Sequence, residues 1–146
     1  MFLRKMTIAL FLIFTSCQKY FISIVQDRVD GDSLASAALY TPDPRAQHPP
    51  LGERLIVEWQ LPRECVEQHP KLYLYVVYKD YTKKEFIYDI THRVDYIVYQ
   101  LLGDAYCDTR GVLAYKAEVK LPDGTIFRTW QHQLWVEPII IEDSSA

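Results

Sequence analysis

Residues 111–136, GVLAYKAEVKLPDGTIFRTWQHQLWV, decide the fold class of this chain. Two runs rich in β-branched and aromatic residues flank the dipeptide Asp123-Gly124. Such runs favour strands, and an Asp-Gly pair between them is the strongest short-range signal for a β-hairpin. We therefore expect a long antiparallel hairpin that turns at these two residues.

A two-residue turn also fixes which residues face each other across the hairpin. The expected pairs are Leu121 with Ile126, Val119 with Arg128, Ala117 with Trp130, Tyr115 with His132 and Leu113 with Leu134. A three-residue turn would place Leu113 opposite Gln133, and a slip of one residue turns every side chain to the other face of the sheet. The two-residue register is therefore preferred. It leaves Arg128 on the apolar face, close enough to the turn for its guanidinium to reach water.

Outward from the hairpin, the chain alternates apolar and polar residues with the period of two that is typical of strands. Leu55, Val57 and Trp59 fall on one face of residues 54–62, as in a half-buried strand. Residues 71–79 are apolar on both faces, which predicts a central strand. The strands expected besides the hairpin are residues 33–44, 54–62, 71–79, 85–90 and 95–102.

Two of these stretches also resemble a known family. LIVEWQLP, residues 55–62, is similar to the second strand of fibronectin type III domains, and LAYKAEV, residues 113–119, resembles their sixth strand with its tyrosine. The resemblance covers roughly residues 34–137. It implies an all-β fold, a single immunoglobulin-like sandwich of about seven strands that follows an N-terminal signal segment, with Trp59 and Tyr115 in its core.

The N-terminus has the order of a secretory signal peptide. Arg4 and Lys5 precede the apolar run MTIALFLIF, and two small residues follow before Cys17. This basic, apolar and small layout is typical of cleaved signals. The run is too short for a membrane span, which needs about 20 apolar residues.

The end of that signal, FTSC, resembles the lipobox of bacterial lipoproteins. The resemblance implies a diacylglycerol on the Cys17 thiol, cleavage just before it and acylation of the new N-terminus. Phe14 stands where leucine is usual in that family. Gln18, which is not Asp, implies the outer membrane, as in Gram-negative members of the family. An ordinary cleaved signal with an incidental Cys17 remains the alternative.

The expected organisation is a signal peptide over residues 1–16, a polar tether over 17–33, the sandwich over 34–141 and a polar tail over 142–146. The 146 residues carry a formal net charge of −3, which becomes more negative when the signal is removed. The sequence contains no run of five basic residues, so nucleic acid is not an expected partner.

Cys65 and Cys107 form the remaining cysteine pair. An oxidising compartment favours a disulfide between them. The expected fold places them in loops at opposite ends of the sandwich, whereas a disulfide needs Cα atoms within about 7 Å. Both outcomes stay open at this point.

One motif suggests a hydrolase. GDSL, residues 31–34, matches the letters that open a family of serine esterases, and Asp89 and His92 fit that family's Asp-x-x-His. Ser33, Asp89 and His92 would then be nucleophile, orienting acid and base. However, that serine follows a buried strand of a parallel α/β sheet, and a motif needs its structural context. A small secreted serine hydrolase using Ser33 is therefore the alternative function.

The aromatic content points to an interface. Tyr73, Tyr75, Phe127 and Trp135 should lie on the outward face of the sheet that holds the third, sixth and seventh strands. Clustered Tyr and Trp are enriched at protein interfaces. The other explanation is that the tail or the tether covers them.

Together these features predict a lipid-anchored protein of the bacterial cell envelope, in the outer membrane, with no catalytic residues. We expect a binding or structural module whose partners are the membrane, through Cys17, and an envelope protein. No metal site or cofactor is expected, because the histidines are scattered and no glycine-rich phosphate loop is present.

Overall fold

The computed structural model describes residues 20–31, 39, 41–42, 44 and 48–136 of the chain. Its strands are β1 (Phe21–Val29), β2 (Gly52–Gln60), β3 (Lys71–Tyr78), β4 (Lys83–Asp89), β5 (Val94–Leu102), β6 (Val112–Lys120) and β7 (Ile126–Gln131). Within this described part, two short helices join strands: α3 (Arg63–Val66) follows β2, and α4 (Gly103–Thr109) follows β5. None of the described helices is long and apolar enough to cross a membrane.

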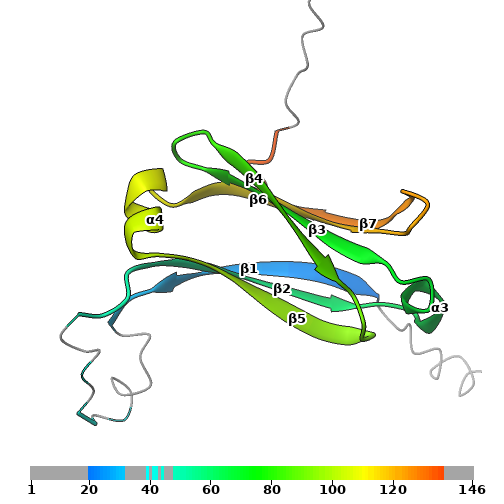
Figure 1. Cartoon of the computed structure of the whole chain (residues 1–146), viewed down its shortest axis with the longest axis horizontal. Coiled ribbons are helices and arrows are strands. Elements are labelled where there is room, and N and C mark those ends of the chain that lie inside the picture. The colour runs from blue at the N-terminus through cyan, green and yellow to red at the C-terminus, as the bar shows by residue number, and fades with distance from the viewer. Residues whose placement is uncertain (1–19, 32–38, 40, 43, 45–47, 137–146) are drawn as a thin grey trace, which may run out of the picture.

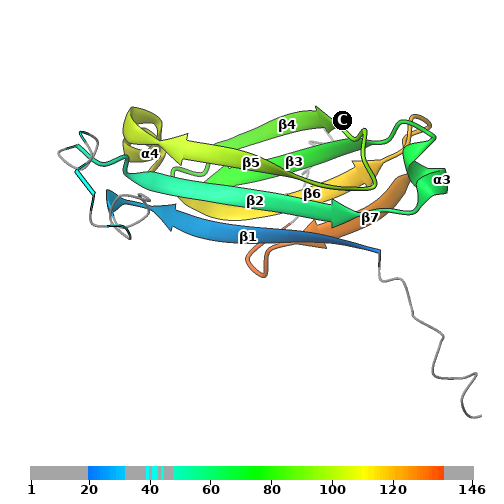
Figure 2. The ribbon, with the colours of Figure 1, turned by 90° about the horizontal axis from the view of Figure 1, so that it is seen from below.

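The strands form two antiparallel sheets that pack as layers (Figure 1). One sheet has the order β1-β2-β5, and the other has the order β4-β3-β6-β7. Figure 2 shows the first sheet face-on, with α3 and the start of β1 at one end and α4 at the other. The predicted seven-strand immunoglobulin-like sandwich is confirmed.

Alternation of side chains builds the core between the layers. Leu55 and Val57 on β2 are completely buried, and the neighbouring Trp59 donates its indole N–H to the carbonyl of His92 at 3.1 Å. Tyr78 on β3 meets Tyr99 on β5 through their hydroxyls at 2.6 Å, which links the two sheets. Burial and the hydrogen bond with Tyr78 raise the pKa of Tyr99, so the Tyr99 hydroxyl stays neutral at physiological pH.

The position of the first strand corrects the sequence analysis. Residues 17–33 were expected to be a tether, but Phe21–Val29 form β1, which pairs along its whole length with β2. Ile22 and Ile24 of this strand are buried in the core. The expected strand over residues 33–44 lies largely outside the described residues, and its described residues are not in a strand. The sandwich therefore begins at Phe21, ahead of the predicted start at residue 34.

The hairpin confirms the predicted register but not the predicted turn. Ala117 faces Trp130, and Val119 faces Arg128, as expected. At the turn, the amide of Gly124 donates to the carbonyl of Leu121 at 2.9 Å, and the loop spans three residues rather than two.

The cause of the longer turn lies in its own residues. Pro122 favours the first position of a type I turn, and Gly124, at φ 85°, takes the left-handed position that completes a three-residue loop. Lys120 consequently pairs with Ile126. A β-bulge next to this pair skips Phe127 and restores the predicted register from Val119–Arg128 to Lys116–Gln131. The predicted pairs Leu121–Ile126 and Leu113–Leu134 are not formed, because the loop is one residue longer and the chain turns after Gln131.

Candidate functional site

The outer face of the four-stranded sheet carries a cluster of aromatic rings and lysines. Leu72, Leu74 and Val76 of β3 point into the core, so the alternate residues point outward. On β6, Ala117 and Val119 likewise point inward. We call the resulting cluster the aromatic–lysine face: Tyr73, Tyr75, Lys83, Lys116, Glu118, Lys120 and Trp135.

Rings and ammonium groups alternate across this face. Lys120 Nζ lies 4.5 Å from the centroid of the Tyr73 ring and donates a hydrogen bond to the Tyr75 hydroxyl at 2.8 Å. Lys83 Nζ lies 5.1 Å from the Tyr75 ring and 5.3 Å from the Trp135 ring. These distances are within the range in which an ammonium group is attracted to an aromatic ring.

Glu118 neutralises part of the positive charge. Its two carboxylate oxygens lie 2.9 Å from Lys116 Nζ and 3.0 Å from Lys120 Nζ. Burial alone would raise the pKa of Glu118, but the hydrogen bonds and charges of the two lysines hold it below its usual value. The hydrogen bond to Tyr75, together with Glu118, raises the pKa of Lys120. Glu118 and Lys120 therefore stay ionised over the physiological pH range.

Trp135 reaches this face by a chain reversal that the sequence did not reveal. The residue follows β7 in a turn closed by its own amide, which donates to the carbonyl of His132 at 2.9 Å. Its side chain is 8% exposed and packs against Tyr75, with the ring centroids 6.3 Å apart. The segment after β7 thus covers part of the face, whereas Tyr73 and Tyr75 remain partly exposed.

Phe127 does not belong to this cluster. The bulge at the start of β7 leaves it without a partner on β6, and its half-buried ring packs against the core. The sequence analysis placed it on the outer face because an unbroken strand was assumed. Ile87 on β4, in contrast, was missed: it lies opposite Tyr73 and is 52% exposed. Alternation within residues 85–90 could have placed it there.

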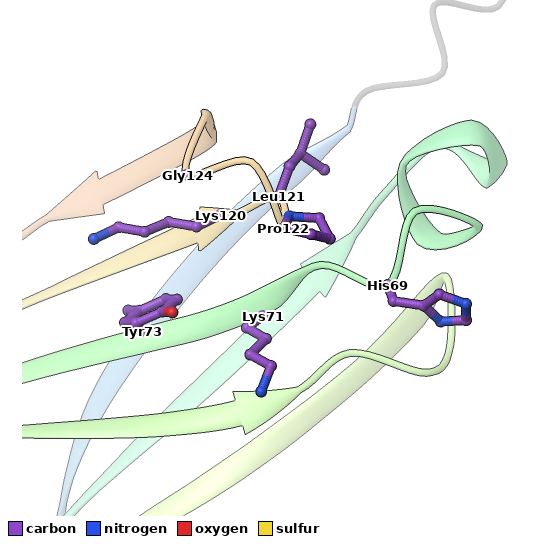
Figure 3. Close-up of a pocket in the computed structure, with 7 residues that line it drawn as sticks. All are labelled: His69, Lys71, Tyr73, Lys120, Leu121, Pro122 and Gly124. Atoms are coloured by element: carbon purple, nitrogen blue, oxygen red, sulfur yellow. The ribbon is translucent and has the colours of Figure 1, made fainter.

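A hollow of about 340 Å³ lies next to this face, where β3 begins and β6 ends (Figure 3). It is lined by His69, Lys71, Tyr73, Lys120, Leu121, Pro122 and Gly124. The stick view shows that the His69 ring and the Lys71 side chain point away from each other. Lys71 is also paired with Asp89 at 3.4 Å. The hollow therefore offers no set of groups converging on one ligand.

Of the three residues of the esterase motif, the structure describes Asp89 and His92, which have separate partners. Ser33 lies outside the described residues. His92 Nδ1 lies 2.9 Å from the Thr91 hydroxyl and 3.5 Å from Asp95, whereas Asp89 pairs with Lys71. His92 is thus engaged with residues other than the expected acid.

The two described cysteines are free thiols. Cys65 is buried in α3, and Cys107 is exposed on α4. These helices lie at opposite ends of the sandwich (Figure 1), so the possible disulfide is not formed. Cys17 and the rest of the signal lie outside the described residues. No group of His, Cys, Asp and Glu that could hold a metal ion occurs among the residues that are described.

No protein family, curated protein or solved structure gives a significant match to the chain.

Proposed function

We propose that this chain is a lipid-anchored protein of the bacterial cell envelope whose sandwich is a non-catalytic binding module. The anchor would be the acylated thiol of Cys17, and the lipobox-like FTSC at residues 14–17 supports it. Several acyl chains give stable membrane attachment, where a single chain gives only marginal binding.

The binding role rests on one observation, the aromatic–lysine face. Rings and ammonium groups held by charge-assisted hydrogen bonds lie on the outside of a sheet whose inner face already packs a complete core. Preordered side chains lose little conformational entropy when a partner binds, and tyrosine is favoured at interfaces. The open part of the face, with Tyr73, Tyr75 and Ile87, is the surface that an envelope protein would contact.

The anchor is tested by labelling growing cells with radioactive palmitate and measuring the intact mass of the purified protein. The wild type should incorporate label and begin at Cys17, and Cys17→Ser should lose the label. Cys107→Ser, which removes an exposed thiol on α4, should keep it. A wild-type chain that retains residues 1–16 without fatty acid contradicts the anchor.

The binding face is tested by photo-crosslinking in living cells. A photoreactive phenylalanine analogue in place of Tyr73 should capture a discrete envelope protein. The same analogue in place of Tyr81, which is more exposed but lies on the β3–β4 turn, should not. Identical crosslinking patterns at the two positions would rule out a dedicated face.

A further inference from the structure

The outer face of the three-stranded sheet is apolar although no described element covers it. Its apolar residues lie on all three strands, and we call them the apolar face: Phe21, Val25, Ile56, Val94, Tyr96 and Val98. Val94 is 66% exposed, Tyr96 62% and Val25 51%. Since the inward residues of the same strands already form the core, these side chains contribute little to folding.

Strand pairing gathers these residues into rows across the sheet. Val25 faces Ile56, and Ile56 in turn faces Val98. Nearer the start of β1, Gln60 lies between Phe21 and Val94 in the same way. Figure 2 shows the three strands side by side; the Val25–Ile56–Val98 row crosses all three, and Val94, Tyr96 and Val98 line the same face of β5. An apolar patch of this kind on a small domain usually marks a contact with a partner or a membrane.

The charges on this side of the sheet are few. Asp27 and Arg54 neutralise each other in an ion pair near the end of β1, away from Phe21. Glu58 lies in the row between Ser23 and Tyr96. The lysines that alternate with rings on the four-stranded sheet have no counterpart on this side among the described residues. The two faces of the sandwich therefore differ in chemistry.

The short segment between Cys17 and β1 indicates what the apolar face contacts. Only Gln18, Lys19 and Tyr20 separate Cys17 from Phe21, the first residue of the strand. A chain extends by at most about 3.6 Å per residue, so the thiol and Phe21 are within about 14 Å of each other. An acyl group on Cys17 would therefore hold β1, an edge strand of the apolar sheet, at the lipid surface.

We infer that the apolar face of the three-stranded sheet rests against the bilayer, which turns the aromatic–lysine face away from the membrane. This inference depends on the lipid anchor proposed above. Tyr96 suits the boundary between head groups and acyl chains, where amphipathic aromatic rings are enriched, and Phe21 adds an apolar ring beside it. The apolar area is small, so the contact needs the anchor and does not replace it.

Depth-dependent fluorescence quenching tests the orientation. The full chain, purified from membranes with Cys107 changed to Ser, receives a bimane label at Val94→Cys or at Ile87→Cys. These two sites lie on the outer faces of opposite sheets and are similarly exposed, at 66% and 52%. The buried Cys65 does not react, and an acylated Cys17 has no free thiol, so each acylated protein carries one label. The proteins are reconstituted into phosphatidylethanolamine–phosphatidylglycerol vesicles that contain lipids with a nitroxide near the head group.

We expect the label at position 94 to be quenched about threefold more strongly than the label at 87, because an interfacial surface sits about 5–10 Å into the lipid boundary. A label at Val25→Cys, on the edge strand β1 of the same face, should be quenched as strongly as the label at Val94→Cys. Agreement between the two sites shows that the quenching does not come from a local folding defect at one of them. Equal quenching at both faces, or stronger quenching at 87, overturns the inference. If the label at 94 is quenched neither by the nitroxide lipids nor by aqueous iodide, the face is covered by another copy of the chain, and the inference is also overturned.

Palmitate content, measured on the same samples, separates the two proposals. Acylated protein without selective quenching refutes the orientation and leaves the anchor intact. Protein without fatty acid refutes the anchor and, with it, the orientation.

Discussion

At the scale of single residues, Glu118 is the most deeply buried charged residue among those that the structure describes. It is 6% exposed and accepts hydrogen bonds from Lys116 and Lys120. Because the carboxylate is removed from water, its ionised form depends on these two ammonium groups. Their positions, in turn, order the Tyr75 hydroxyl and the rings around it.

Glu118→Gln should lower the free energy of unfolding by about 2 kcal/mol at neutral pH, since it weakens two charge-assisted hydrogen bonds. The pKa of Glu118 is lower in the folded than in the unfolded chain, so its stabilisation is complete above the unfolded value of about 4.3. It is lost as the pH falls through the folded value. The difference between wild type and variant should therefore shrink in acid, as measured by urea unfolding at several pH values.

Glu85→Gln is the matched control for this measurement. Glu85 lies opposite Tyr75 on β4 but is exposed, so its loss should change stability by less than about 0.5 kcal/mol at any pH. Equal effects of the two substitutions would show that the buried pairings do not contribute.

At the scale of strands and turns, two glycines are required for different reasons. Gly124 has φ 85°, and an added Cβ would meet nothing within 4 Å. Gly52 begins β2, and an added Cβ there would lie 2.1 Å from the backbone carbonyl oxygen of Leu101. The first position is thus limited by backbone conformation and the second by space.

Gly124→Ala should cost about 1 kcal/mol, the penalty for a left-handed residue with a side chain. Gly52→Ala should cost about 3 kcal/mol, because strands β2 and β5 must move apart to admit the methyl group. Denaturant midpoints of the two variants provide the measurement. A smaller loss for Gly52→Ala than for Gly124→Ala would contradict the close approach of these strands.

The strands were largely predictable from the sequence, and the exceptions have physical causes. Alternation identified β2, β3 and β6, and it placed Tyr73 and Tyr75 on an outer face. Strand β1 was missed because an edge strand tolerates polar residues such as Asp27 and Arg28, which resemble a tether in composition. Trp135 lies on the predicted face but reaches it through a chain reversal after β7, and the position of Phe127 depends on a bulge; neither the reversal nor the bulge leaves a periodic signal.

At the scale of the whole molecule, the sandwich keeps its two described thiols apart. Cys65 lies in α3 and Cys107 in α4, at opposite ends of the layers (Figure 1). Burial raises the pKa of the Cys65 thiol, which leaves it protonated and unreactive at neutral pH.

A maleimide should therefore modify Cys107 quickly in the native protein and Cys65 only after unfolding. Reducing agent should leave the melting temperature unchanged, because no bond between these thiols is present to break. Mass spectrometry of peptides from alkylated samples would measure both sites. Rapid native labelling of Cys65, or a melting temperature that falls on reduction, would contradict this arrangement.

Strand β5 affects how the purified protein behaves in storage. It is an edge strand of its sheet and has nine residues, VDYIVYQLL. None of these residues is Lys, Arg, Pro or Gly. Asp95 is its single charge, and over Tyr96–Leu102 no charged residue discourages a neighbouring chain from adding a strand to the free backbone groups. A detergent-free stock at high concentration should therefore accumulate thioflavin-binding fibrils during storage, and their protected amides should map to residues 94–102.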